Sequence, residues 1–188
     1  MSELIMSTDT DNTENENFSS KAANIALMGF DVDGVLTDGT LYFTSAGDEM
    51  KAFSSLDGHG LRLLQRFGIE VVIISGRRSR ALELRAQNFG ITALHMGVED
   101  KRSVMQQLVA ERGLKISQAG YMGDDVVDLP VLLACGFSAT VANGHTEVIK
   151  RVDYVTKLDS GKGAAREVCD LILRAKGHWE TMMRSYLS

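Results

Sequence analysis

Short, mostly apolar segments recur along this chain, at intervals that leave room for a helix between most of them. They are residues 25–30, 69–74, 93–96, 118–122 and 137–141, followed by a weaker segment at 153–156. Apolar runs of this length are typical of strands that are buried on both faces of a sheet. Between them, apolar residues spaced three and four apart predict helices that end at Gly68, Gly90 and Gly113, and a last helix over residues 164–176.

This alternation predicts an α/β fold, a doubly wound, Rossmann-like parallel sheet with helices on both faces. Residues 40–53 are the exception, because alternating apolar and polar residues around a turn predict a small inserted β-hairpin. Such a hairpin is not stable alone, so it packs on its own core or on another copy of the chain. The connections after Gly34 and after Ser75 are too short to hold a cap domain.

Composition divides the chain into one domain, residues 25–176, and two tails. Residues 1–24 are polar and acidic, which predicts a flexible tail and neither a signal peptide nor an anchor. The ending, residues 177–188, carries Trp179 and Tyr186, so we expect it to dock on the body or on a neighbouring subunit. No later apolar run is long enough to span a membrane.

The charge of the body is balanced. Residues 1–20 hold five of the 25 acids and no base, which leaves 20 acids against 20 bases elsewhere. A neutral body without a broad basic face argues against nucleic acid as a partner. Cys135 and Cys169 lie in apolar helical contexts and are interpreted as buried thiols rather than ligands or a disulfide, which suits a reducing cytoplasm.

Carboxylates follow two of the predicted strands. Asp31 and Asp33 come after the first strand, and Asp124, Asp125 and Asp128 come after the segment 118–122. Each set alone could consist of loop, turn and cap residues. Because the carboxyl ends of parallel strands share one edge of a sheet, we expect Asp31, Asp33 and Asp124 to meet there and to bind Mg²⁺. Whether Asp125 and Asp128 touch the metal is left open.

Groups that suit phosphate end at the same edge. Ser75, Gly76 and Arg77 directly follow the strand at 69–74, and Lys101 opens a helix, where it is either solvated or neutralises an anion. Arg77 is the favoured arginine and Arg85 the second, while others belong to a solvated helix face. The loop at 54–60 suits an anion or a sugar hydroxyl, although Asp57 serves equally well as a helix N-cap.

This set of residues suits phosphoryl transfer. Asp31 could attack phosphorus, and Asp33 could protonate the leaving oxygen and then activate water. Ser75 could bind a phosphoryl oxygen, and Lys101 could stabilise the transferring group.

The motifs resemble those of a known superfamily. Asp31-Val32-Asp33-Gly34-Val35-Leu36-Thr37-Asp38, Ser75-Gly76-Arg77, Lys101, and Gly123-Asp124-Asp125 with Asp128 are similar to the four ordered motifs of the haloacid dehalogenase-like phosphatases. More narrowly, the chain resembles the family of 3-deoxy-D-manno-octulosonate 8-phosphate (Kdo 8-phosphate) phosphatases. The hairpin and residues 57–60 and 161–169 carry that likeness.

The resemblance implies a capless, Mg²⁺-dependent homotetramer that acts on a small-molecule sugar phosphate, with hairpins assembling the core and a neighbouring subunit helping to close the site. The implied substrate-binding positions are Asp33, Ser54, Ser55, Leu56, Asp57, Gly58, Arg62, Gly76, Arg77, Arg85 and Lys101. A phosphatase for an acylneuraminate 9-phosphate is the alternative within the class. Outside it stand a non-catalytic phosphate-binding module and an aspartyl-phosphate receiver, against which the presence of Asp33 argues.

Overall fold

The computed structural model describes residues 18–187, and its centre is a six-stranded parallel sheet in the order β5-β4-β1-β6-β7-β8. The strands are β1 (Leu27–Phe30), β4 (Glu70–Ser75), β5 (Ala93–Met96), β6 (Ala119–Met122), β7 (Phe137–Thr140) and β8 (Tyr154–Val155). β1 lies in the middle, pairing Leu27 with Glu70 of β4 and with Ala119 of β6. The predicted strands and the doubly wound architecture are confirmed.

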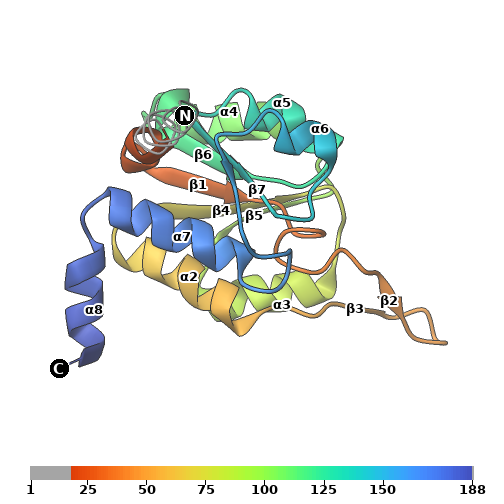
Figure 1. Cartoon of the computed structure of the whole chain (residues 1–188). Helices are drawn as coiled ribbons and strands as arrows, with labels where there is room; N and C mark the ends of the chain where they lie inside the picture. The colour runs from red at the N-terminus through yellow and green to blue at the C-terminus, as the bar shows by residue number, and fades with distance from the viewer. Residues whose placement is uncertain (1–17, 188) are drawn as a thin grey trace, which may run out of the picture.

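Helices cover both faces of the sheet (Figure 1). α2 (Ser55–Arg66), α3 (Arg80–Phe89) and α7 (Ala164–Ala175) lie on one face, and α4 (Lys101–Glu111), α5 (Leu129–Leu132) and α6 (Thr146–Ile149) on the other. β1 shows why its sequence is apolar throughout, since Met28 and Phe30 belong to one buried cluster and Leu27 to the other. Short 3₁₀ turns, Ile116–Gln118 and Val126–Asp128, precede β6 and α5.

The hairpin projects from the body (Figure 1). It pairs β2 (Tyr42–Phe43) with β3 (Glu49–Met50). Leu41, Tyr42, Phe43 and Met50 are between 41% and 58% exposed, so its apolar side chains are not buried on the chain's own core. Of the two predicted placements, packing on the chain's own core is met only at the base of the segment, where Phe53 packs against the core.

The N-terminal end of the domain differs from the prediction, whereas the C-terminal end docks on the body as expected. A tail is expected up to residue 24, but residues 18–23 are helical, with Ala22 fully buried and Phe18 against the ring of Tyr154. Residues 1–17 of the predicted tail lie outside the described residues. At the other end α8 (Trp179–Leu187) packs on its own chain, because Met182 is buried and Trp179 lies under the guanidinium of Arg174.

Two further expectations concern membranes and cysteines. Among the helices of the described part of the chain, none has the length and apolar character needed to cross a membrane. Cys135 and Cys169 are both free thiols, as predicted, but only Cys169 is fully buried.

Candidate active site

The loop after β1 places Asp31 at the carboxyl edge of the sheet. Its amide donates to the carbonyl of Met122 in the neighbouring strand at 2.9 Å, and its Oδ1 accepts from the Val32 amide at 2.7 Å. The residue is 7% exposed. Gly34 follows with φ of 83°, and a Cβ there would lie 2.1 Å from Oδ2 of Asp124. A side chain at position 34 would therefore separate the two acidic loops.

Three carboxylates converge at this edge. Asp31, Asp124 and Asp128 each offer an oxygen, and these oxygens all lie within 4.8 Å of one another. Lys101, at the first position of α4, brings its Nζ within 2.6 Å of Asp31 Oδ2 and 2.6 Å of Asp128 Oδ1. One ammonium therefore faces three carboxylates in a buried setting, which leaves an excess of negative charge.

The pKa values of these groups reflect the excess charge. Burial, followed by the charge of Asp128, raises the pKa of Asp31 to about 7, although Lys101 opposes the change. Burial and the charge of Asp31 likewise raise the pKa of Asp124 to about 7. Burial works against the ammonium of Lys101, but its two carboxylate partners raise its pKa above the ordinary value.

This cluster fits a magnesium ion. Mg²⁺ prefers oxygen ligands, and its charge would relieve the repulsion that raises the two carboxyl pKa values. Asp31, Asp124 and Asp128 all have an oxygen within reach of one such ion, and the first two are the predicted carboxylate ligands. Asp128 is fully buried and already engaged, since one oxygen binds Lys101 and the other accepts the amides of Asp124 and Asp125 at 3.1 and 3.4 Å. Asp128 therefore orients the loop and the lysine.

Asp33 lies outside the cluster of carboxylates. The turn at Gly34 directs it toward the hairpin, where its carboxylate accepts a hydrogen bond from Lys51 and lies 3.7 Å from Arg77 Nε. The Asp33 carboxylate is therefore not one of the clustered groups, and a role of Asp33 in binding the metal stays a prediction. Asp33 still lines the same cavity as Asp31.

A cavity of about 460 Å³ opens over these groups. The residues that line it are Asp31, Asp33, Ser75, Gly76, Arg77, Val98, Glu99, Lys101, Asp124, Asp125 and Val127. Ser75 is 2% exposed at the end of β4, and its Oγ accepts the amide of Arg77 at 3.3 Å. All four predicted catalytic residues thus share one cavity, which also holds the predicted Gly76 and Arg77.

The other predicted substrate residues lie apart from this cavity. They are Ser54, Ser55, Leu56, Asp57, Gly58, Arg62 and Arg85. Arg85 and Arg62 lie 4.0 and 5.8 Å from the centre of the Phe89 ring, and Arg85 also donates to the carbonyl of Ser54 at 3.3 Å. Burial, together with the charge of Arg62, lowers the pKa of Arg85. A role of these residues in substrate binding stays a prediction.

Asp57 is not the N-cap of its own helix, as the sequence suggests, but caps a different helix. Ser54 is the N-cap of α2, and its hydroxyl accepts the amide of Asp57. The buried carboxylate of Asp57 accepts the amides of Arg166 at 2.8 Å and Gly163 at 3.4 Å, so it caps α7. Burial raises its pKa.

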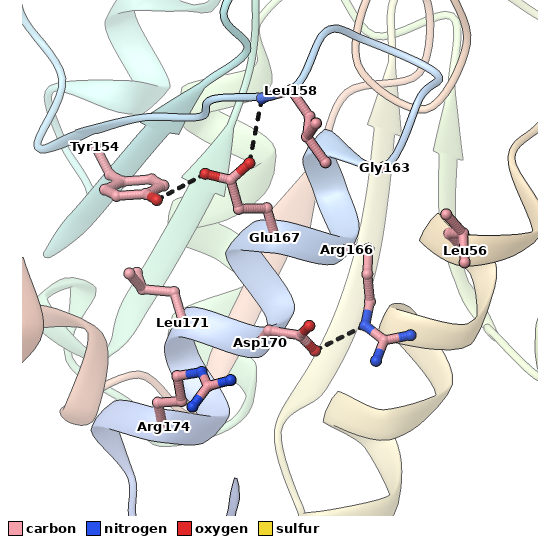
Figure 2. Close-up of a pocket in the computed structure, with 9 residues that line it drawn as sticks. All are labelled: Leu56, Tyr154, Leu158, Gly163, Arg166, Glu167, Asp170, Leu171 and Arg174. Carbon is pink, nitrogen blue, oxygen red and sulfur yellow. Dashed lines mark hydrogen bonds and ion pairs between the residues drawn. The ribbon is translucent and has the colours of Figure 1, made fainter.

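A second hollow, of about 390 Å³, lies along the outer side of α7 (Figure 2). Its polar groups pair with one another, as Glu167 binds the Tyr154 hydroxyl at 2.7 Å and Asp170 binds Arg166 at 2.7 Å. Of the predicted site residues only Leu56 lines it. The ionisable groups suited to phosphate chemistry are therefore concentrated at the cavity around Asp31.

Lys51 is the functional candidate that sequence reasoning missed. It lies after β3 in a segment read only for its apolar alternation, and its side chain is 2% exposed. A lysine within a predicted hairpin usually faces solvent, so its approach to Asp33 has no local signal in the sequence.

The fold and the site define a haloacid dehalogenase-like hydrolase. The model of that family matches residues 85–168. The chain is 45% identical over 160 residues to 3-deoxy-D-manno-octulosonate 8-phosphate phosphatase of Yersinia pestis, covering 85% of this chain and 86% of that protein, and 44% identical over 157 residues to the Escherichia coli K12 enzyme, covering 84% of each. This chain therefore belongs to the 3-deoxy-D-manno-octulosonate 8-phosphate phosphatase family.

Solved structures agree with this assignment. The crystal structure of the Y. pestis phosphatase superposes with a TM-score of 0.86 at 44% identity, covering 88% of this chain and 89% of that one. A Moraxella catarrhalis phosphatase structure in complex with magnesium, phosphate and Kdo gives a TM-score of 0.89 at 38% identity, covering 92% and 98%. The resemblance seen in the motifs is confirmed, and so is the capless α/β fold.

Proposed function

We propose that this chain is a Mg²⁺-dependent phosphomonoesterase that hydrolyses Kdo 8-phosphate to Kdo and inorganic phosphate. The observation that carries the proposal is the buried contact of Asp31 with Lys101, beside Asp124, at the edge of the sheet where ligands bind in this architecture. The substrate class follows from the relatives, which are named as Kdo 8-phosphate phosphatases and which match this chain over most of their length.

Asp31 is the proposed nucleophile. Its Oδ2 is held by Lys101 and its Oδ1 by the Val32 amide, so the carboxylate has a defined orientation. It forms a bond to phosphorus as the bond from phosphorus to the sugar oxygen breaks, and the leaving oxygen takes a proton from Asp33. Asp33 then accepts a proton from water, which attacks the aspartyl phosphate and releases phosphate and free Asp31.

The remaining residues stabilise and place the phosphoryl group. Lys101 supplies positive charge beside the attacking oxygen, and the hydroxyl of Ser75 and the guanidinium of Arg77 lie on the wall of the same cavity. Mg²⁺ held by Asp31 and Asp124 supplies the charge that lets an anionic nucleophile approach an anionic phosphate.

Substrate selection is proposed to depend on assembly. Within residues 18–187 no cap domain covers the cavity, and Arg62, Arg85 and the loop at 54–58 lie outside it, so we propose that a neighbouring subunit closes the site. The exposed side chains of Leu41, Tyr42, Phe43 and Met50 on the hairpin suit a homotetramer interface. Sedimentation of the parent and of Phe43→Asp tests this, and a parent that stays monomeric contradicts it.

Two free thiols agree with action in the cytoplasm.

The function is tested by phosphate release with Mg²⁺ from Kdo 8-phosphate, an acylneuraminate 9-phosphate and p-nitrophenyl phosphate. We expect Kdo 8-phosphate to have the highest kcat/KM, by about 100-fold or more over the aryl ester, because only its sugar can supply binding energy. Preference for the acylneuraminate ester would transfer the substrate assignment to that sugar. Absence of turnover on all three would refute the enzymatic proposal. Asp31→Asn is the control for contaminating phosphatase.

A further inference from the structure

Lys51 is a charged residue with an almost completely buried side chain. Its exposed fraction is 2%, compared with 45% for Arg77, the other cation at Asp33. Its Nζ donates a hydrogen bond to Asp33 Oδ1, and Glu49 Oε1 is 3.5 Å away. A buried ammonium is tolerated only while it is paired, so Lys51 and the Asp33 carboxylate hold one another in place.

The pair is part of a closed ring of alternating charges that links the hairpin to the cavity. Arg77 Nη2 binds Glu49 Oε2 at 2.8 Å, and Arg77 Nε lies 3.7 Å from Asp33 Oδ2. The hairpin supplies Lys51 and Glu49, whereas Asp33 and Arg77 follow β1 and β4. Because Arg77 is exposed, its contacts are weakly restraining, and Lys51 is the member that fixes the position of Asp33.

The two aspartates of the first motif thus have one lysine each. Lys101, on α4, contacts Asp31 at 2.6 Å, and Lys51, after β3, contacts Asp33. We infer that Lys51 is a positioning residue, which holds the Asp33 carboxylate where it can exchange a proton with the leaving oxygen and then with water. The inference rests on the proposed function and assigns the hairpin a part in the chemistry, in addition to any part in assembly.

Replacing Lys51 by methionine keeps the length and removes the charge. We expect kcat for Kdo 8-phosphate to fall by about 10- to 100-fold with KM within about twofold, since a misplaced proton donor slows chemistry without weakening binding. The Mg²⁺-induced rise in melting temperature should stay, because the metal cluster is separate from Lys51. Lys51→Arg should recover most of the rate. The matched control is Lys150→Met, which removes an exposed lysine paired with Glu147 and should leave kcat unchanged.

A double-mutant cycle separates positioning from a general loss of structure. If Lys51 acts through Asp33, Lys51→Met should be nearly silent in an Asp33→Asn background, because the group that it positions is gone. Its effect on kcat/KM should also be larger for Kdo 8-phosphate than for p-nitrophenyl phosphate, whose leaving group departs without a proton. A variant that is only less stable would show the same rate loss with and without Asp33, and the same rate loss for both substrates.

Three results overturn the inference. The first is a kcat of Lys51→Met equal to that of the parent. The second is an equal loss of kcat from Lys51→Met with and without Asp33. The third is a rise in KM with kcat unchanged, which would make Lys51 a substrate contact. Failure of the proposed function looks different, because the parent itself would then leave Kdo 8-phosphate intact. In that case the cycle is run on kcat for p-nitrophenyl phosphate, where Asp33 still has to activate water, and the same three results decide.

Discussion

The acidic cluster should make the metal-free protein less stable than a variant that lacks one of its charges. We expect Asp124→Asn to unfold at a higher temperature than the parent in EDTA, although it loses turnover. The pKa of Asp124 is raised from its ordinary value of 3.8 to about 7 by burial and by the charges of Asp31 and Asp128. Ionising it therefore costs more in the folded chain than in the unfolded chain.

The size and sign of the effect follow from that shift. A difference of about three pH units corresponds to roughly 4 kcal/mol at full ionisation, and partial solvent access reduces this to about 2 kcal/mol. The folded-state pKa lies above the unfolded one, so the cost is absent below about pH 4, grows between about pH 4 and pH 7, and is complete above pH 7. For a chain of this size, about 2 kcal/mol corresponds to a rise of roughly 4–8 °C.

The assay is thermal unfolding in EDTA at about pH 5 and about pH 8, where the linkage argument predicts a small gain and a full gain respectively. Asp125→Asn is the matched control, because this neighbouring carboxylate is exposed and its amide substitute keeps the contact to the Val126 amide. Addition of Mg²⁺ should stabilise the parent and the control more than Asp124→Asn. A variant that melts below the parent at pH 8, or gains as much at pH 5 as at pH 8, would refute the reasoning.

Three more outcomes are expected. Asp31→Asn should lower kcat by at least about 10³-fold because the nucleophile is lost, with an unchanged circular dichroism spectrum, and residual activity near the parent level would remove Asp31 from that role. EDTA should abolish phosphate release, and Mg²⁺ should restore it better than Ca²⁺, which prefers more ligands and longer bonds; equal recovery would argue against a compact octahedral site. Met182→Ala should destabilise the fold by about 2 kcal/mol in urea unfolding with kcat unchanged, since Met182 is the buried residue of α8, whereas unchanged stability would mean that α8 is not docked in solution.

The convergence of the site was predictable from the chain because it depends on strand order alone. Asp31, Ser75 and Asp124 each follow a strand whose apolar character marks it as central, and parallel strands end at one edge. The motifs then indicated phosphoryl transfer as the chemistry. Lys101 was also accessible, since it opens a helix where a cation is unfavourable without an anion nearby.

Contacts that depend on packing between distant segments were not predictable. Asp57 reads as a local N-cap, yet its carboxylate binds the amide of Arg166, more than a hundred residues along the chain. The local pattern makes Lys51 one position of an alternating hairpin, but in the fold its side chain is buried against Asp33, which follows a distant strand. The burial of Met182, which lies on α8, likewise depends on packing against α7, which no local pattern in the ending describes.

The hairpin has an outer apolar side and an inner side that carries Lys51. A restraint on one side also restrains the other. A two-stranded hairpin is only marginally stable alone, and the exposed ion pair of Glu49 with Arg77 adds less than about 1 kcal/mol to hold it. Its outer side chains remain exposed in the single chain, whereas its inner side carries the lysine at Asp33. A contact that covers Phe43 and Met50 would thus also restrict the motion of Lys51. In a fold without a cap, the proposed assembly through the hairpin would supply a physical route from a neighbouring subunit to Asp33, the proposed proton-transfer residue.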